Sequence, residues 1–468
     1  MIDGTHVQCR VSWENAWNLE GLAAPHNHDA VWIFIKYKKA DQNWEQAQVL
    51  SSKINFEYDS QAVQIATVAD QNGFFIQSNR KGSVSLLSAQ ITIPLAVNFS
   101  SGSYELKVFG IEMVWIPQGS FYIGDAWAQQ SLSRGDSLKP FYIRSERMIA
   151  HGTDSLSLRD TGKSDPKDSI PALFPKGYRG FYCMKYELSQ KQYADFLNCL
   201  NYTQQINRTV FAPNSGILTG ALAQPLSNRN GISIQSSGVA PSLPAVYACN
   251  MNQNEIFNDP SDAENRACNF LNWADLSAYL DWAALRPLSE LEFEKVCRGP
   301  QYPVAGEFAW GTALSVDANS LIYDATDSEQ VNDIITPGAG LASYGYIGPQ
   351  GPLRVGFAAK SNSTRLESGA AYYGVMEMSG NLWEQCVTVL GKEGLSFDGT
   401  LGDGLLNSDG DANTPYWPVN TGIGAGYRGG AWLSGVLANF RDPAVSARFY
   451  IGLKPDQRRN TSGGRGAR

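Results

Sequence analysis

The chain has 468 residues, of which 43% are hydrophobic and only 18% are charged, and its formal net charge is −8. The acidic balance excludes a protein that binds nucleic acid through a general basic face, and no run of about 20 apolar residues predicts a membrane span. Many glycines and aromatic residues are typical of a compact, loop-rich globular protein, and the length allows two or three domains.

Residues 1–108 predict a β-sandwich-like, all-β domain. The segment 7–13 alternates apolar and polar residues, and 30–38 is rich in branched and aromatic residues. Two further strand-like runs follow at 90–97 and 104–109, separated by turn residues. Residues 1–4 lack the basic and then apolar pattern of a signal peptide, so export or surface display would require a leader that has been removed.

From residue 109 onward the pattern changes to a mixture of helices and irregular chain. Residues 113–124 predict a β-hairpin around a Pro-Gln-Gly turn, and helices are predicted within 187–200 and 273–282. A third helix is predicted over 290–297, with Ser289 as N-cap and Glu292 completing a capping box. We expect its glutamates to have capping and salt-bridge roles in preference to catalysis.

Six short motifs occur together along this second region. They are IPQGSFYIG at 116–124, YELSQKQYADFL at 186–197, RPLSELEFE at 286–294, FAWG at 308–311, GVMEMSGNLWE at 374–384 and RGGAW at 428–432. Together, and in this order, they resemble the sulfatase-modifying-factor family, whose founding member is the formylglycine-generating enzyme. The resemblance implies an α+β fold, a C-type lectin-like domain with much irregular structure over residues 109–468.

The same resemblance implies that the catalytic chemistry is missing. Enzymes of this family use two cysteines after the Arg-Gly-Gly element, which bind copper and oxidise a substrate cysteine. The matching positions here are Ser434 and Asn439, and no cysteine follows Cys386. A thiolate is the soft ligand and redox partner that copper needs, and a serine hydroxyl does not replace it. We therefore expect no copper and no catalytic residues.

A structural calcium site is implied around the GNLWE motif. The residues are Glu377, Gly380, Leu382 and Glu384, since carboxylates and glycine-turn carbonyls suit a hard cation. In the alternative, Glu384 binds backbone amides or an arginine and braces the turn without metal.

Residues 433–462 mix aromatic, aliphatic and charged residues without a period of 2 or 3.6. Such a mixture is typical of a contact face for a protein or other macromolecule. The predicted ligand-binding residues are Leu433, Ser434, Val436, Leu437, Asn439, Arg441, Phe449, Tyr450, Ile451, Lys454, Gln457, Arg459 and Asn460. If these side chains are buried, the segment is an ordinary loop of an inactive family member.

The C-terminal markers resemble a second class, the variable proteins of diversity-generating retroelements. In that class the diversified segment opens near Arg-Gly-Gly-x-Trp and ends in a glycine-rich tail like GGRGAR at 463–468. The leading hypothesis is a non-catalytic binding protein that displays a variable surface from about residue 428 to 468. The alternatives are a divergent oxidoreductase or hydrolase of the family and a structural surface component.

Overall fold

The computed structural model describes residues 5–40, 42–58 (backbone only at 56–58), 62–97, 99, 103–125, 130–160, 162, 167–437 and 440–468. Asn439, a predicted contact residue, lies outside the described residues. Within them the chain forms five α-helices and 26 mostly short strands. This mixture agrees with the predicted α+β class. No described helix is long and apolar enough to cross a membrane.

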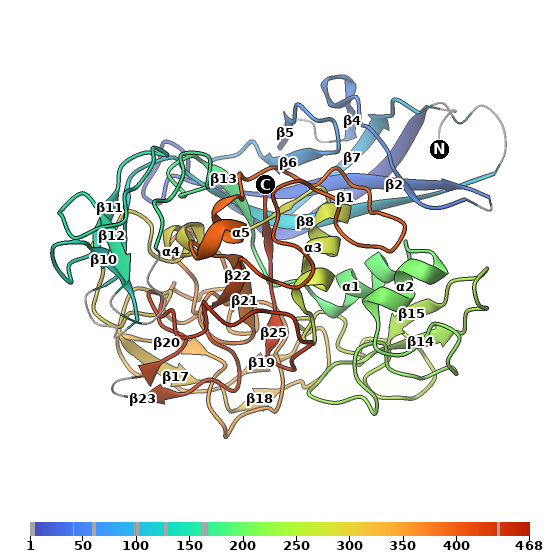
Figure 1. The fold of residues 1–468 in the computed structure, drawn as a ribbon. Coiled ribbons are helices and arrows are strands. Elements are labelled where there is room, and N and C mark those ends of the chain that lie inside the picture. Colours follow the sequence, from blue (N-terminus) through green and yellow to red (C-terminus); the bar gives the residue numbers. More distant parts are fainter. Residues whose placement is uncertain are drawn as a thin grey trace.

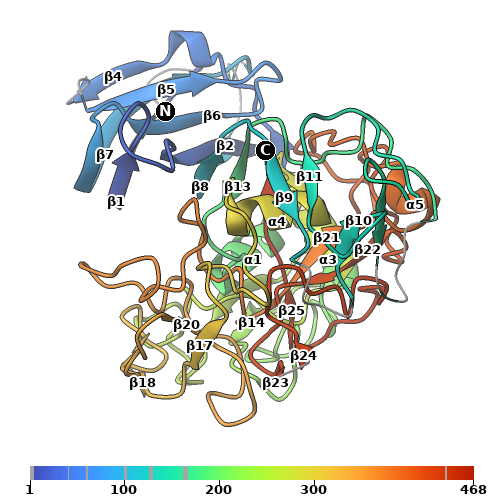
Figure 2. The same ribbon diagram turned by 90° about the vertical axis from the view of Figure 1, so that its left-hand side faces the viewer.

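The N-terminal strands form two facing sheets, seen at the top of Figure 2. The first sheet is antiparallel, in the order β1 (His6–Asn18), β7 (Gly82–Pro94) and β4 (Asn55–Tyr58). A short 3₁₀ turn, Ser51–Lys53, precedes β4. The second sheet contains β5 (Val63–Thr67), β6 (Phe74–Ser78), β2 (Asp29–Lys39) and β8 (Tyr104–Ile116), with β3 (Glu45–Gln46) beside β2.

Strand β2 is the centre of the molecule because both of its faces are buried. Val31, Ile33 and Ile35 belong to the core between the two N-terminal sheets. Trp32 and Phe34 point the other way, into the core shared with the helices. Alternate residues of a strand face opposite sides, and a near-continuous apolar run is what a strand covered on both sides requires.

The second sheet continues into the C-terminal half of the chain. Beyond β8 it adds β13 (Phe181–Met184), β26 (Gly466–Ala467) and β16 (Arg286–Pro287). The boundary expected at residue 108 therefore falls inside β8, and the two regions share one sheet. Figure 1 shows the C-terminal end of the chain beside these strands.

The predicted hairpin over 113–124 is wrong. Its first half is the end of β8, which pairs with β2 on one side and with β13 on the other. Its second half, β9 (Phe121–Ile123), pairs instead with β11 (Phe141–Ile143). Because both edges of β8 are already occupied, β9 has to find another partner.

Four of the helices begin at a capping box. They are α1 (Gln190–Leu197), α2 (Tyr202–Arg208), α3 (Trp273–Trp282) and α4 (Glu290–Arg298), and the uncapped α5 is Gly391–Leu395. In α1 and α4 the hydroxyl of Ser189 or Ser289 accepts from the amide three residues later, which confirms the predicted N-cap Ser289.

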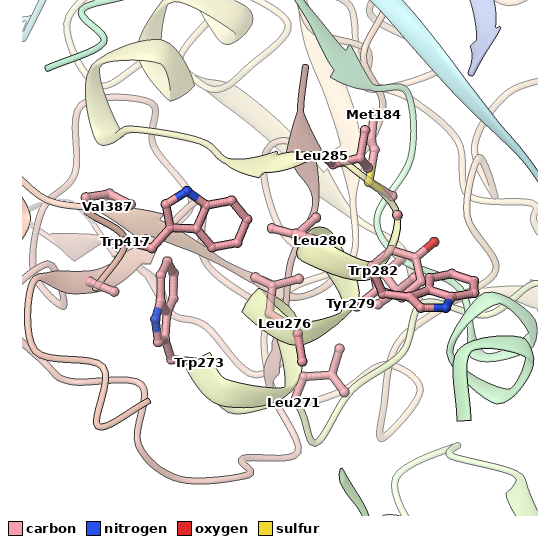
Figure 3. Packing of buried hydrophobic residues seen from close by; sticks show 14 of the residues in the cluster. Met184, Leu271, Trp273, Leu276, Tyr279, Leu280, Trp282, Leu285, Val387 and Trp417 are labelled. Carbon is pink, nitrogen blue, oxygen red and sulfur yellow. The ribbon is translucent and has the colours of Figure 1, made fainter. Parts of the chain in front are cut away.

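Helix α3 is buried on every side and anchors the main core. Figure 3 shows Leu276 and Leu280 on this helix between Trp273, which lies near Trp417, and Tyr279 and Trp282 on the other side. Trp282 meets Phe34 of β2 edge to face, with ring centroids 5.2 Å apart. Such aromatic contacts stabilise the packing of helix against sheet beyond the area that they bury.

The remaining strands pair in short units. These are β10 (Leu132–Arg134) with β12 (Leu158–Asp160), β14 (Ile232–Ser236) with β15 (Val246–Cys249), β17 (Leu314–Asp317) with β20 (Ala339–Ala342), β18 (Leu321–Ile322) with β19 (Gln330–Val331), β22 (Ala425–Arg428) and β25 (Ser462–Gly463) with β21 (Trp383–Val387), and β23 (Val436–Leu437) with β24 (Phe440–Arg441).

Candidate ligand-binding site

The Arg-Gly-Gly segment and the glycine-rich C-terminal tail lie on opposite edges of β21. Strand β22 pairs with β21 antiparallel and ends at Arg428, and β25 pairs with β21 in parallel from Ser462. Residues 429–461, here called the return segment, leave this small sheet and come back to it. Both ends of the segment are therefore fixed on β21. Strands β23 and β24 of the segment lie at the end of the molecule away from the N-terminal sheets (Figures 1 and 2).

One glycine at the start of the return segment is required by the close approach of the chain. Gly430 has φ +70°, and a Cβ built on it would lie 2.7 Å from Cγ of Pro443 and 2.8 Å from its backbone nitrogen. A side chain would meet backbone there in addition to the strain of a left-handed conformation.

Buried ion pairs hold the base of the return segment on helix α4. The Arg428 guanidinium donates to Glu290 at 3.1 Å, to Glu294 at 2.8 Å and to the Val445 carbonyl at 2.7 Å. Arg448, also fully buried, donates from Nε to Glu290 at 2.7 Å. Burial raises the pKa of Glu290 to about 7, and the charge of Arg428 opposes that rise. These contacts agree with the salt-bridge role expected for the glutamates of α4.

A cavity of about 550 Å³ lies where the return segment meets β21. Its described lining residues are Tyr346, Trp383, Leu433, Ser434, Gly435, Phe440, Asp442, Tyr450, Arg458, Arg459, Asn460 and Thr461. Five of the predicted contact residues are among them. The volume is in the range of small-molecule and side-chain pockets.

Ser434 is one of the most buried residues of the cavity wall, and its hydroxyl is fully used. It accepts a hydrogen bond from the Ala431 amide at 2.8 Å and donates to Oδ2 of Asp442. The same Oδ2 atom accepts from Trp383 Nε1 at 3.1 Å. Burial raises the pKa of Asp442 above its usual range, and the hydrogen bonds from Ser434 and Trp383 oppose that rise.

Aromatic rings form much of the wall. Trp383 lies between Tyr427 and Tyr450, with centroid distances of 5.1 and 4.8 Å. Phe440 packs on Phe449 with centroids 4.4 Å apart. The Trp383 side chain is half-buried and lines the cavity.

The other predicted contact residues divide into exposed and anchored groups. Leu437 is 67% exposed, and Lys454 and Gln457 are also exposed. Arg441 instead donates to the carbonyls of Gly306 and Ala313, at 3.3 and 2.9 Å.

Two further residues, Val436 and Ile451, pack inward. Val436 packs against the cluster around Trp310. Ile451 is fully buried, so the prediction that it contacts ligand is wrong: its backbone passes directly over Gly426 of β22.

Several lining residues were missed by the sequence reasoning. Phe440, Asp442 and Arg458 lie within the stretch that was singled out, and Trp383 lies within a family motif. Their proximity to the predicted contact residues was the available signal. Tyr346 comes from a long loop that gives no such signal.

At the implied calcium site, the protein itself binds one oxygen of each carboxylate, while the second oxygens of Glu377 and Glu384 are buried without a partner among the described residues. Oε1 of Glu384 accepts from Arg465 Nε at 2.6 Å, and Oε1 of Glu377 accepts from the Gly356 amide at 3.0 Å. The amide of Gly380 is bound to the Gly429 carbonyl, and the amide of Leu382 donates to Glu187 at 2.9 Å. No group of three metal-binding side chains occurs among the described residues. The contacts favour the alternative in which an arginine braces Glu384.

The cysteines of the chain lie outside the cavity wall. All seven are free, and none lines the described cavity wall. Burial raises the pKa of the Cys386 thiol, which lies in β21, well above its ordinary value. A thiol in such surroundings is inert at neutral pH.

Comparison with known proteins agrees with the six motifs. The family model described as sulfatase-modifying factor enzyme 1-like domain matches residues 107–468. A search of the curated proteins found no match for the chain. Since the family model covers well over half of the sequence, the chain belongs to the sulfatase-modifying factor family.

Proposed function

We propose that this protein is a non-catalytic member of its family that binds a protein or other macromolecule at the return segment. The observation that supports this proposal is the identity of one residue in the cavity wall, Ser434. Where the resemblance places the first catalytic cysteine, the cavity has Ser434, whose hydroxyl is engaged by Asp442. The scaffold around the site is kept while the thiolate is replaced.

The surroundings of Ser434 suit recognition better than nucleophilic or redox chemistry. The common base for a serine nucleophile is a histidine, and the histidines of this chain, at positions 6, 26, 28 and 151, do not line the cavity. Ser434 instead donates to the carboxylate of Asp442, and a carboxylate is ordinarily a weaker base than an imidazole. Aromatic rings beside charged and amide side chains are instead the composition of binding hot spots.

The architecture that we propose for residues 109–468 is C-type lectin-like, preceded by an all-β, sandwich-like region. Within it, the exposed side chains Leu437, Lys454 and Gln457 and the cavity wall would form the contact surface. We further propose that the segment 428–468 belongs to a retroelement-diversified variable protein. Fixed segment ends with exchangeable outward side chains are what such diversification requires, as in antibody paratopes.

Two experiments test this proposal. The purified protein is incubated aerobically, with and without copper, with a peptide that carries a sulfatase-type cysteine motif, and the peptide is followed by mass spectrometry. We expect unchanged cysteine. Conversion of the cysteine to an aldehyde would replace the proposal by the alternative, a divergent oxidoreductase of the family.

The diversification proposal has a separate test in the genome that encodes the protein. We expect a reverse transcriptase gene and a near-copy of the codons for residues 428–468 beside the gene. Their absence would overturn diversification and leave the binding function standing.

A further inference from the structure

The cavity contains a buried carboxylate that the described residues leave without a cation. Asp442 is only 6% exposed, and its Oδ2 atom accepts from Ser434 and Trp383. Among the described residues, none forms an ion pair with Asp442 or donates to its second oxygen, Oδ1, and this oxygen is not sealed from solvent. A largely buried carboxylate with one accessible oxygen is stabilised when a cation with hydrogen-bond donors approaches that oxygen.

The two arginines of the cavity wall do not supply that cation. Arg458 is held away by Asp275, to which it donates at 2.7 and 2.8 Å, and by the carbonyls of Thr209 and Asn207. Arg459 is only half-buried, so water screens its charge.

The aromatic wall adds a second feature that favours a cation. Trp383, Tyr450, Phe440 and Tyr346 line the same space as Asp442. The face of an aromatic ring attracts an ammonium or guanidinium group, and the attraction grows when the cation loses water. The rings also offer apolar surface to the methylene stem of a long basic side chain.

We propose that this cavity receives a lysine or arginine side chain of a protein partner, with its charged group at Oδ1 of Asp442 and its stem against Trp383 and Tyr450. This inference rests on the proposed binding function and names the chemistry of its ligand. The net charge of −8 on the chain complements a basic partner.

The test uses four small probes on the full chain: the N-acetyl amides of lysine, arginine, norleucine and glutamate. Saturation-transfer NMR detects binding, and titration gives the affinity. We expect lysine or arginine amide to bind at least about tenfold more tightly than norleucine amide, which has the same stem without the charge. Equal binding of these probes, a preference for glutamate amide, or no binding of either basic probe at millimolar concentration would overturn the inference.

Variants assign the effect to Asp442. Asp442→Asn keeps an acceptor for Ser434 and Trp383 but removes the charge, and should weaken the basic probe about tenfold. Asp456→Asn, an exposed carboxylate of the return segment that does not line the cavity, is the matched control and should change nothing. Unchanged affinity in Asp442→Asn contradicts the inference.

If Asp442→Asn does not fold, Arg459→Gln decides the question. Removing the cation from the cavity wall should strengthen the basic probe, and weaker binding of that probe would contradict the inference. If a macromolecular partner binds the return segment with an affinity that neither substitution alters, the inference of a bound cation is wrong but the binding function stands. Oxidation of the cysteine peptide would instead sink the binding function.

Discussion

The return segment has two regions that differ in burial: its base, where it contacts α4, and its exposed part around Lys454 and Gln457, here called the rim. At the base, Arg428 and Arg448 are fully buried and meet the carboxylates of α4. At the rim, Lys454 and Gln457 are exposed. Arg448 and Lys454 are only six positions apart in the sequence. The comparison teaches that a few inward arginines hold the segment on α4, whereas its outward side chains take no part in these buried contacts.

Removing a base arginine should have the largest effect. Arg428→Ala leaves Glu290 and Glu294 with fewer partners in a dry interior, and breaking a buried ion pair costs about 3–5 kcal/mol. Urea denaturation should show this loss in the free energy of unfolding. Lys454→Ala at the rim should stay within about 0.5 kcal/mol of the wild type. Equal losses of unfolding free energy in the two variants would contradict the distinction between base and rim.

The second prediction concerns pH and the buried carboxyl of Glu377. Burial raises its pKa from 4.5 to about 7, against the opposing charge of Arg465. Between these values the folded state binds more protons than the unfolded state, so the free energy of unfolding falls as pH rises. At about 1.4 kcal/mol per pKa unit, the loss between pH 4.5 and 7 is about 3 kcal/mol.

Glu377→Gln should remove the share of this dependence that belongs to Glu377, because the amide oxygen still accepts from the Gly356 amide without titrating, whereas Glu290, whose pKa is also raised to about 7, contributes in both proteins. Urea denaturation from pH 4.5 to pH 7 compares the variant with the wild type. Glu393→Gln, an exposed carboxyl of α5, should follow the wild-type profile. A Glu377→Gln profile that parallels the wild type would show that this carboxyl does not titrate across the range.

Replacing Gly430 sharpens the comparison at the start of the segment. Gly430→Ala combines a positive φ with a close contact to Pro443 and should destabilise by about 1–3 kcal/mol. Gly435→Ala is the control, because its Cβ would first meet Phe440 at 3.9 Å and its φ is ordinary. Thermal unfolding separates the two, and a stable Gly430→Ala would mean that the segment can shift at its base.

Chelation should have the smallest effect. Since Arg465 occupies the carboxylate of Glu384, we expect EDTA to leave Tm unchanged. A Tm that falls with EDTA and recovers with added Ca²⁺ would restore the calcium site implied by the resemblance.

The elements that the sequence predicted well carry local signals. In each capping box, at Ser189 and at Ser289, the two partners are three residues apart in the sequence. Such a helix start depends on the local sequence and requires no contact with distant segments. The six motifs likewise predicted the family that the match over residues 107–468 confirms.

The predictions were wrong where contacts with distant chain segments determine strand pairing or side-chain burial. Strand β9 pairs with β11 because β2 and β13 occupy β8, which no local pattern reveals. In the return segment, Ile451 is buried and Leu437 exposed although both are branched apolar residues in chain without a period. Asp442 resembles any loop aspartate until Trp383 and Ser434 are brought to it.

The last strand, β26, has a consequence for how faulty copies of this chain would behave. It pairs with β13 at Cys183 and with β16 at Arg286, so this edge of the shared sheet is complete only when the chain that follows the return segment has reached it. Pairings between such distant residues form late in folding. A substitution that blocks the path therefore leaves the scaffold itself unfinished, and the defect is exposed to proteolysis. The stability of the shared sheet is thereby tied to the path of residues 429–461.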